Sequence, residues 1–94
     1  MNEEGMKLVN NQIKKFLDSY NISYKILDSG HSISVTINKK PSLEERIVQE
    51  EFWEKFINEY NINTELVDID VHYKDPGDEY WNSLYYNIKN NEWI

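Results

Sequence analysis

The sequence predicts a small α+β domain with elements in the order α-β-β-α-β-α and an antiparallel three-stranded sheet covered on one face by helices. Two segments place apolar residues at helical spacing, and three shorter segments alternate apolar and polar residues as strands do. The chain has 94 residues, enough for one core and one domain over residues 1–94. It has no cysteine, which excludes disulfide bonds and a zinc site built on sulfur.

The first predicted helix covers residues 6–20, and two strands follow at residues 22–28 and 31–39. Between the strands, Gly30 can supply the positive φ that a tight turn requires. The second strand alternates strictly, so we expect one face of this hairpin to be buried. The apolar side of the helix is formed by Met6, Val9, Ile13, Phe16, Leu17 and Tyr20.

The second predicted helix begins at Ser42, which forms a capping box with Glu45: each side chain accepts a hydrogen bond from the other residue's backbone N–H. Its apolar arc includes Trp53, and its glutamates lie on the opposite arc. A third strand over residues 64–73 alternates apolar residues with acidic ones and a histidine. Its apolar face is therefore expected to pack on the core.

The phrase KFLDSYNISYKILD at residues 15–28 is echoed by KFINEYNINTELVD at residues 55–68. In both copies a helix runs into Tyr-Asn-Ile, which places Asn21 and Asn61 where a left-handed residue ends a helix. We interpret the echo as two uses of one helix stop, with an ancient duplication as the alternative. This interpretation assigns four aromatic residues to the core: Phe16, Tyr20, Phe56 and Tyr60.

The last segment, residues 75–94, fits either a helix or a fourth strand. Asp75 and Pro76 resemble a helix start, and one helical stripe would join Trp81 to its apolar neighbours. The aromatic content favours a strand, and Asp-Pro-Gly-Asp could form a turn. We predict a helix over residues 78–89, which places Trp81 in the core and exposes Tyr86.

Charge is distributed unevenly along the chain, whose formal net charge is -7. Residues 1–41 contain six lysines and four acids, whereas residues 42–94 contain thirteen acids and four basic residues. Acidity of this kind argues against direct contact with nucleic acid and favours a basic protein as partner. An alternative is that the acids only keep the protein soluble.

Asp68, Asp70 and His72 form the sharpest pattern that could hold a metal, with His31 as a further potential ligand. Spacing of two residues along a strand is poor geometry for one ion, so a solvated strand face is the favoured interpretation. There is no nucleophile motif and no glycine-rich phosphate loop. We therefore expect no enzyme, no catalytic or metal site and no cofactor.

The predicted function is that of a small acidic inhibitor that occupies a basic, nucleic-acid-binding surface of another protein, for example by mimicking nucleic acid. In size, acidity and mixed helix-sheet order the chain is similar in type to phage anti-defence proteins, such as anti-CRISPR inhibitors, and to nuclease immunity proteins. It has no motif specific to one of these families. The residues expected to contact the partner are Glu44, Glu51, Glu54, Asp68, Asp70, His72, Asp75, Asp78, Glu79, Tyr86 and Trp93.

The alternative function is a non-catalytic adaptor or subunit, and a metal-dependent enzyme using the aspartate and histidine strand is the least favoured. The sequence shows no signal peptide and no apolar run long enough to cross a membrane. We therefore expect a cytoplasmic protein of a bacterial host cell, without a membrane partner. Its oligomeric state is left open.

Overall fold

The computed structural model describes residues 3–29 and 32–94. Gly30 and His31, to which the sequence assigns a turn and a possible metal ligand, lie outside these residues. No helix in the described ranges is long and apolar enough to cross a membrane. The elements are α1 (Glu3–Ser19), β1 (Tyr24–Ser29), β2 (Ser32–Ile37), α2 (Leu43–Glu59), β3 (Asp68–Tyr73), the 3₁₀ turn η1 (Tyr80–Asn82), β4 (Leu84–Asn87) and β5 (Glu92–Trp93).

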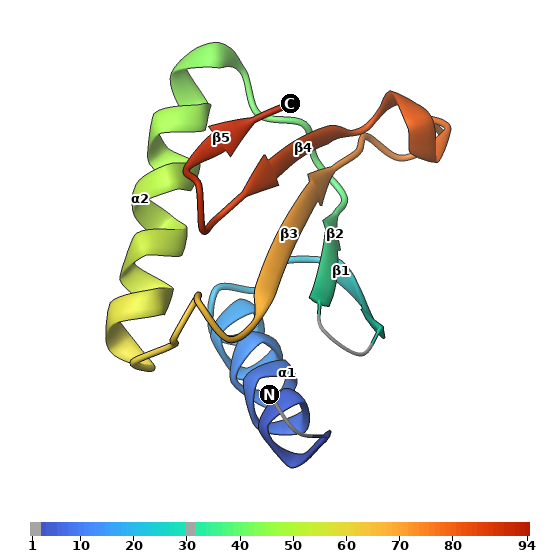
Figure 1. The fold of residues 1–94 in the computed structure, drawn as a ribbon. Helices are drawn as coiled ribbons and strands as arrows, with labels where there is room; N and C mark the ends of the chain where they lie inside the picture. Colours follow the sequence, from blue (N-terminus) through green and yellow to red (C-terminus); the bar gives the residue numbers. More distant parts are fainter. Residues whose placement is uncertain (1–2, 30–31) are drawn as a thin grey trace.

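The predicted α+β class is confirmed, but the sheet is mixed and five-stranded rather than antiparallel and three-stranded. Its strands lie in the order β1-β2-β3-β4-β5 (Figure 1). The pair β2–β3 is parallel, and the other neighbouring pairs are antiparallel. A parallel pair needs a long crossover connection, and α2 supplies it. The helix that the sequence predicts between these strands is therefore what makes them parallel.

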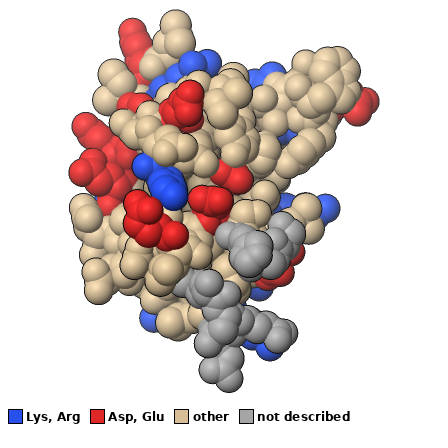
Figure 2. Space-filling model, viewed as in Figure 1, with Lys and Arg blue, Asp and Glu red and all other residues tan. Residues whose placement is uncertain are grey.

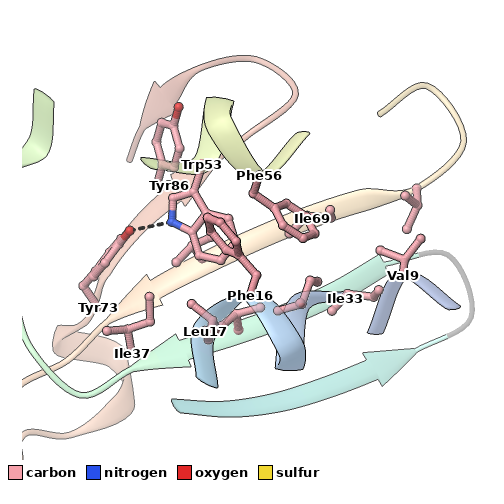
Figure 3. Close-up of a cluster of buried hydrophobic side chains, with 14 of the residues drawn as sticks. Val9, Phe16, Leu17, Ile33, Ile37, Trp53, Phe56, Ile69, Tyr73 and Tyr86 are labelled. Atoms are coloured by element: carbon pink, nitrogen blue, oxygen red, sulfur yellow. Dashed lines mark hydrogen bonds between the residues drawn. The ribbon is translucent and has the colours of Figure 1, made fainter. Parts of the chain in front are cut away.

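The core lies between one face of the sheet and both helices, as predicted (Figures 1 and 3). The parallel register pairs Ile33 with Ile69 and Val35 with Val71, so apolar side chains from β2 and β3 form adjacent rows. Burying such rows supplies the main force for folding, at about 25 cal/mol per Å² of apolar surface. From the helices, the fully buried side chains in this layer are Ile13, Leu17, Trp53 and Phe56.

The local helix signals are confirmed. Ser42 and Glu45 make both hydrogen bonds of the capping box. Asn21 and Asn61 adopt φ values of 56° and 52°. After each helix, an isoleucine N–H returns to a carbonyl of the last turn, at 3.2 Å for α1 and 3.0 Å for α2. This is the long bond of a Schellman ending, so the repeated phrase includes two matching helix stops.

The helix predicted over residues 78–89 is wrong, and the strand alternative is correct. Asp75 accepts a hydrogen bond from the N–H of Asp78, and Gly77 between them has a φ of 91°. This geometry fits a type II turn, with proline before the glycine. After the short turn η1 the chain pairs with β3 as strand β4 and returns as β5. Pairing along β3 satisfies backbone groups that a helix at this place would leave unpaired.

This change of element reverses the exposure of two aromatic residues. Trp81, predicted to lie in the core, is 78% exposed. Tyr86, predicted to be exposed, is buried, with only 3% of its surface exposed, and Trp93 beside it is half-buried. Tyr20 is also outside the core, at 45% exposure, although its ring packs edge-on against Phe16. Phe16 itself is buried as predicted.

Candidate functional site

The residues expected to contact a partner lie in four places. Glu44, Glu51 and Glu54 lie exposed on α2. Asp68, Asp70 and His72 lie on the sheet face opposite the helices, because they alternate with the buried residues of β3. Asp75, Asp78 and Glu79 lie in the loop after β3, and Tyr86 and Trp93 lie on the helix-facing side of the β4–β5 hairpin. Figure 2 shows acidic groups gathered on the side of the molecule where α2 lies.

One group of these residues surrounds a groove between α2 and the β4–β5 hairpin, with a volume of about 470 Å³. We call it the acidic groove. Its apolar lining comes from Ile47, Ile57 and Ile88, its acidic lining comes from Glu50, Glu51 and Glu54, and Tyr86 also borders it. Residues separated by three or four positions share one helix face, so α2 directs these carboxylates to the same side. Thr64 and Asn91 complete the lining.

The hairpin wall of the groove is held against α2 by the indole of Trp93. Its Nε1 donates a hydrogen bond to Glu50 Oε1 at 3.2 Å. The Arg46 guanidinium lies over the same ring, 5.2 Å from the centroid. Tyr86 packs on the Trp93 ring at 4.7 Å between centroids. Contacts of this kind orient the hairpin, so the groove is part of the folded structure.

Tyr86 and Asn91 both line the acidic groove, and the Tyr86 hydroxyl donates a hydrogen bond to Asn91 Oδ1. Burial raises the pKa of Tyr86, and the negative charges of Glu50 and Glu54 add to this effect, so that the pKa is about 12. Both carboxylates therefore act on the groove interior. A neutral tyrosine hydroxyl there remains a donor over the whole physiological pH range.

The carboxylates of the acidic groove have no ion-pair partner within residues 3–29 and 32–94. The ion pairs in those ranges join Lys39 with Glu45, Lys40 with Asp78, and Lys89 with Glu65, at 3.7, 3.2 and 3.5 Å. Three neighbouring acids without a basic partner repel one another and attract cations. Glu50 already accepts the hydrogen bond of the Trp93 indole, so the charges most available to an external group are those of Glu51 and Glu54.

The open face of the sheet is less free to bind, because Asp70 is already engaged. It accepts a hydrogen bond from Asn87 Nδ2 at 2.9 Å. Burial raises the pKa of Tyr85 to about 12, with a further contribution from its hydrogen bond to Asp70. Asp68 is exposed and has no such partners in the part of the chain that the structure describes. Of the two acids on β3, only Asp68 is thus accessible to a partner without rearrangement.

His72 lies between two tyrosine rings, with centroids 5.0 Å from Tyr80 and 4.9 Å from Tyr85. Burial lowers its pKa, and the nearby charge of Asp70 opposes that change. Among the described residues, no group of three histidine or acidic side chains is placed to hold a metal ion. The three polar residues of β3 form a row along one face of the strand, and His31 lies outside the described residues.

The loop after β3 presents two aromatic side chains that the sequence did not identify as exposed. Asp75 accepts a hydrogen bond from the backbone N–H of Lys40 at 2.9 Å, and Asp78 forms an ion pair with the same lysine at 3.2 Å. These contacts fasten the loop to the segment before α2. Beyond them, Tyr80 is 52% and Trp81 78% exposed. The sequence signal for this was the strand alternation at residues 84–87. A strand there places Tyr80 and Trp81 in the preceding loop, outside the core.

The fold and the site define a small α+β protein with an acidic, partly apolar groove. No protein-family model, curated protein or solved structure matches the chain. Its function therefore has to be argued from the chemistry of the site.

Proposed function

We propose that the protein is a non-catalytic antagonist that binds a basic surface on another protein, the surface with which that protein contacts nucleic acid. The observation that carries this proposal is the acidic groove, where three carboxylates without ion-pair partners in the described residues lie beside apolar side chains. Unpaired charge gives fast, salt-sensitive association, and a neighbouring apolar surface adds affinity that salt affects less.

Charge favours a basic protein over a nucleic acid as the partner. The net charge of -7 repels phosphates, and the acids are concentrated in residues 42–94, which include the whole groove. Rows of carboxylates present to a basic surface the same sign and similar acceptor atoms as a phosphate backbone. An inhibitor of a nuclease or of a CRISPR effector, acting in the bacterial cytoplasm, would use this chemistry.

The test is capture of a partner from bacterial lysate at low and high salt, followed by competition with nucleic acid. We expect a basic protein to be retained at low salt and released at high salt, because exposed charges are screened within about 10 Å at 0.1 M salt. The double variant Glu51→Lys/Glu54→Lys should lose it. The control Asp18→Lys/Glu59→Lys makes the same change in net charge at two exposed acids outside the groove and outside the expected contact residues, and it should retain more of the partner.

Competition decides between antagonism and mere binding. The purified partner should release its nucleic acid as this protein is added, and the Glu51→Lys/Glu54→Lys variant should not displace it. Simultaneous binding of the nucleic acid and this protein to the partner would show that the antagonist proposal is wrong.

A second function, a non-catalytic adaptor or subunit, is favoured by the loop that presents Trp81. A tryptophan 78% exposed on an anchored loop is a typical interface anchor. It would act through apolar contact rather than charge. Complex formation that survives high salt and Glu51→Lys/Glu54→Lys, but is lost in Trp81→Ala, would favour this function over the antagonist. A light-scattering concentration series would show whether the partner is a second copy of the chain.

A further inference from the structure

We infer that the acidic groove receives an arginine side chain of the partner, inserted between α2 and the β4–β5 hairpin. The inference rests on the proposed function, because it names the group of a basic surface that this site recognises. It adds what net charge alone does not give, namely one residue type and one place of entry.

The lining of the groove matches a side chain that is apolar along its stem and cationic at its end. Ile47, Ile57 and Ile88 supply apolar surface, and the carboxylates of Glu51 and Glu54 lie on the exposed side of α2. Long basic side chains bury their methylene groups against apolar surface while their charged ends stay near water and acids. The volume of about 470 Å³ falls in the range of pockets that bind small molecules, about 300–1,000 Å³, so a single long side chain can enter.

Electrostatics inside the groove favours a cation. Glu50 is half-buried, and its charge, with that of Glu54, helps to hold the Tyr86 hydroxyl in its neutral form. A positive group in the same space would meet these charges at low screening, because the walls exclude part of the solvent. A divalent metal ion is disfavoured as the occupant, since no set of three acidic or histidine side chains in the described ranges is arranged to hold one.

Arginine fits better than lysine for a reason visible beside the groove. The protein already holds Arg46 with its guanidinium over the Trp93 ring, while Glu50 accepts the hydrogen bond of the same indole. A planar guanidinium can lie against a ring and pair with two carboxylate oxygens at once, whereas an ammonium is a compact and strongly hydrated charge. The exposed carboxylates of Glu51 and Glu54 offer an entering guanidinium this paired hydrogen bonding.

The experiment is an NMR titration of the ¹⁵N-labelled protein with short blocked peptides of glycine and serine. The peptides carry one central arginine, one central lysine, or one central citrulline, which has the shape of arginine without the charge. With the arginine peptide we expect saturable shifts in the amides of residues 50–54 and 86–91 and in the Trp93 indole N–H. We expect weaker binding of the lysine peptide and no shifts in the groove with citrulline.

Two double variants locate the effect. Glu51→Gln/Glu54→Gln should weaken arginine binding about tenfold, because two partly exposed ion pairs contribute up to about 1 kcal/mol each. Asp18→Asn/Glu59→Gln removes the same charge outside the groove and outside the expected contact residues, and it should weaken arginine binding less than twofold. All four acidic residues are exposed, so both variants should keep the fold, and circular dichroism checks this.

Three results would overturn the inference: equal shifts with citrulline, binding of lysine as tight as that of arginine, or equal weakening by the two variants. The last result would mean that attraction comes from overall charge, and it would leave the antagonist proposal intact. Conversely, if arginine enters the groove but the captured partner keeps its nucleic acid, the antagonist proposal fails and the arginine site stands.

Discussion

Replacing Tyr73 by phenylalanine tests the one polar link at the centre of the core. The Tyr73 hydroxyl accepts a hydrogen bond from Trp53 Nε1 and donates one to Gln49 Oε1, each 2.8 Å long. Trp53 is 0% and Tyr73 1% exposed, and Figure 3 shows the two side chains meeting between α2 and β3. The substitution removes one oxygen atom and leaves the indole N–H of Trp53 in the core without an acceptor.

The expected loss follows from that orphaned donor. Leaving a buried donor unsatisfied costs about 1–3 kcal/mol. Gln49 is half-buried and can turn its amide towards water, so it adds little. We therefore expect Tyr73→Phe to lower the free energy of unfolding by about 2 kcal/mol. For a domain of 94 residues this corresponds to a fall in Tm of about 8–16 °C.

The measurement is urea denaturation followed by far-ultraviolet circular dichroism, which does not depend on the surroundings of Trp53. The control is Tyr60→Phe. Tyr60 packs against Phe56, with centroids 5.2 Å apart, and no hydrogen bond of its hydroxyl is found in residues 3–29 and 32–94. Its removal should change the stability by less than about 0.5 kcal/mol. Equal effects of the two substitutions would refute the assigned role of the Tyr73 hydroxyl.

Three further expectations concern backbone and titration. Asn61 has a φ of 52°, so Asn61→Ala should be about 1 kcal/mol less stable than Asn61→Gly in urea, and equal stabilities would contradict the helix-stop geometry. Tyr85 and Tyr86 have pKa values raised from 10.0 to about 12, so the unfolded chain releases these protons first. The stability they contribute is present below pH 10 and falls as the pH rises through 10 towards 12. In urea titrations on either side of pH 10, Tyr85→Phe/Tyr86→Phe should make the free energy of unfolding fall less steeply with pH. An unchanged slope would contradict this expectation. Burial lowers the pKa of His72 from 6.5, so its contribution is present above pH 6.5 and is lost as the pH falls through the folded pKa; an imidazole NMR titration giving 6.5 or more would contradict this.

Local signals in the sequence were sufficient to predict helices α1 and α2. The capping box at Ser42 and the asparagines at residues 21 and 61 determine where α2 begins and where both helices end, because each acts through hydrogen bonds within a few residues. The order of strand, helix and strand over β2, α2 and β3 was also a signal for parallel pairing. The interpretation of the sheet as antiparallel overlooked it.

The C-terminal segment could not be decided locally. Its aromatic residues satisfy a helical stripe through Trp81, and they also satisfy strand alternation through Leu84 and Tyr86. The alternation prevails because β3 offers an unpaired edge and α2 offers a surface for Tyr86 and Trp93, and both of these elements lie outside the segment itself. Tertiary context of this kind routinely overrides local propensity.

The same error concealed the candidate site. The helical spacing of the sequence placed Glu51 and Glu54 on the outward arc of α2. That a partner binds these two residues stays a prediction. Glu50 was not identified, since the groove that it borders exists only when residues 84–93 form a hairpin beside α2. With a helix over residues 78–89, the side of the groove formed by Tyr86, Ile88 and Asn91 would not exist. Errors of secondary structure thus affect site prediction most where two distant elements form one surface.

The parallel pairing of β2 with β3 also has a consequence for how the chain folds. The outer strands pair with neighbours close in sequence, and hairpins of that kind close within about 1–10 μs. The central pair can form only after the loop containing all of α2 has closed, which carries a larger entropic penalty. We expect the two antiparallel units to be assembled first and the middle of the sheet to be joined last. The slowest step in folding would then lie at the best-buried part of the native protein.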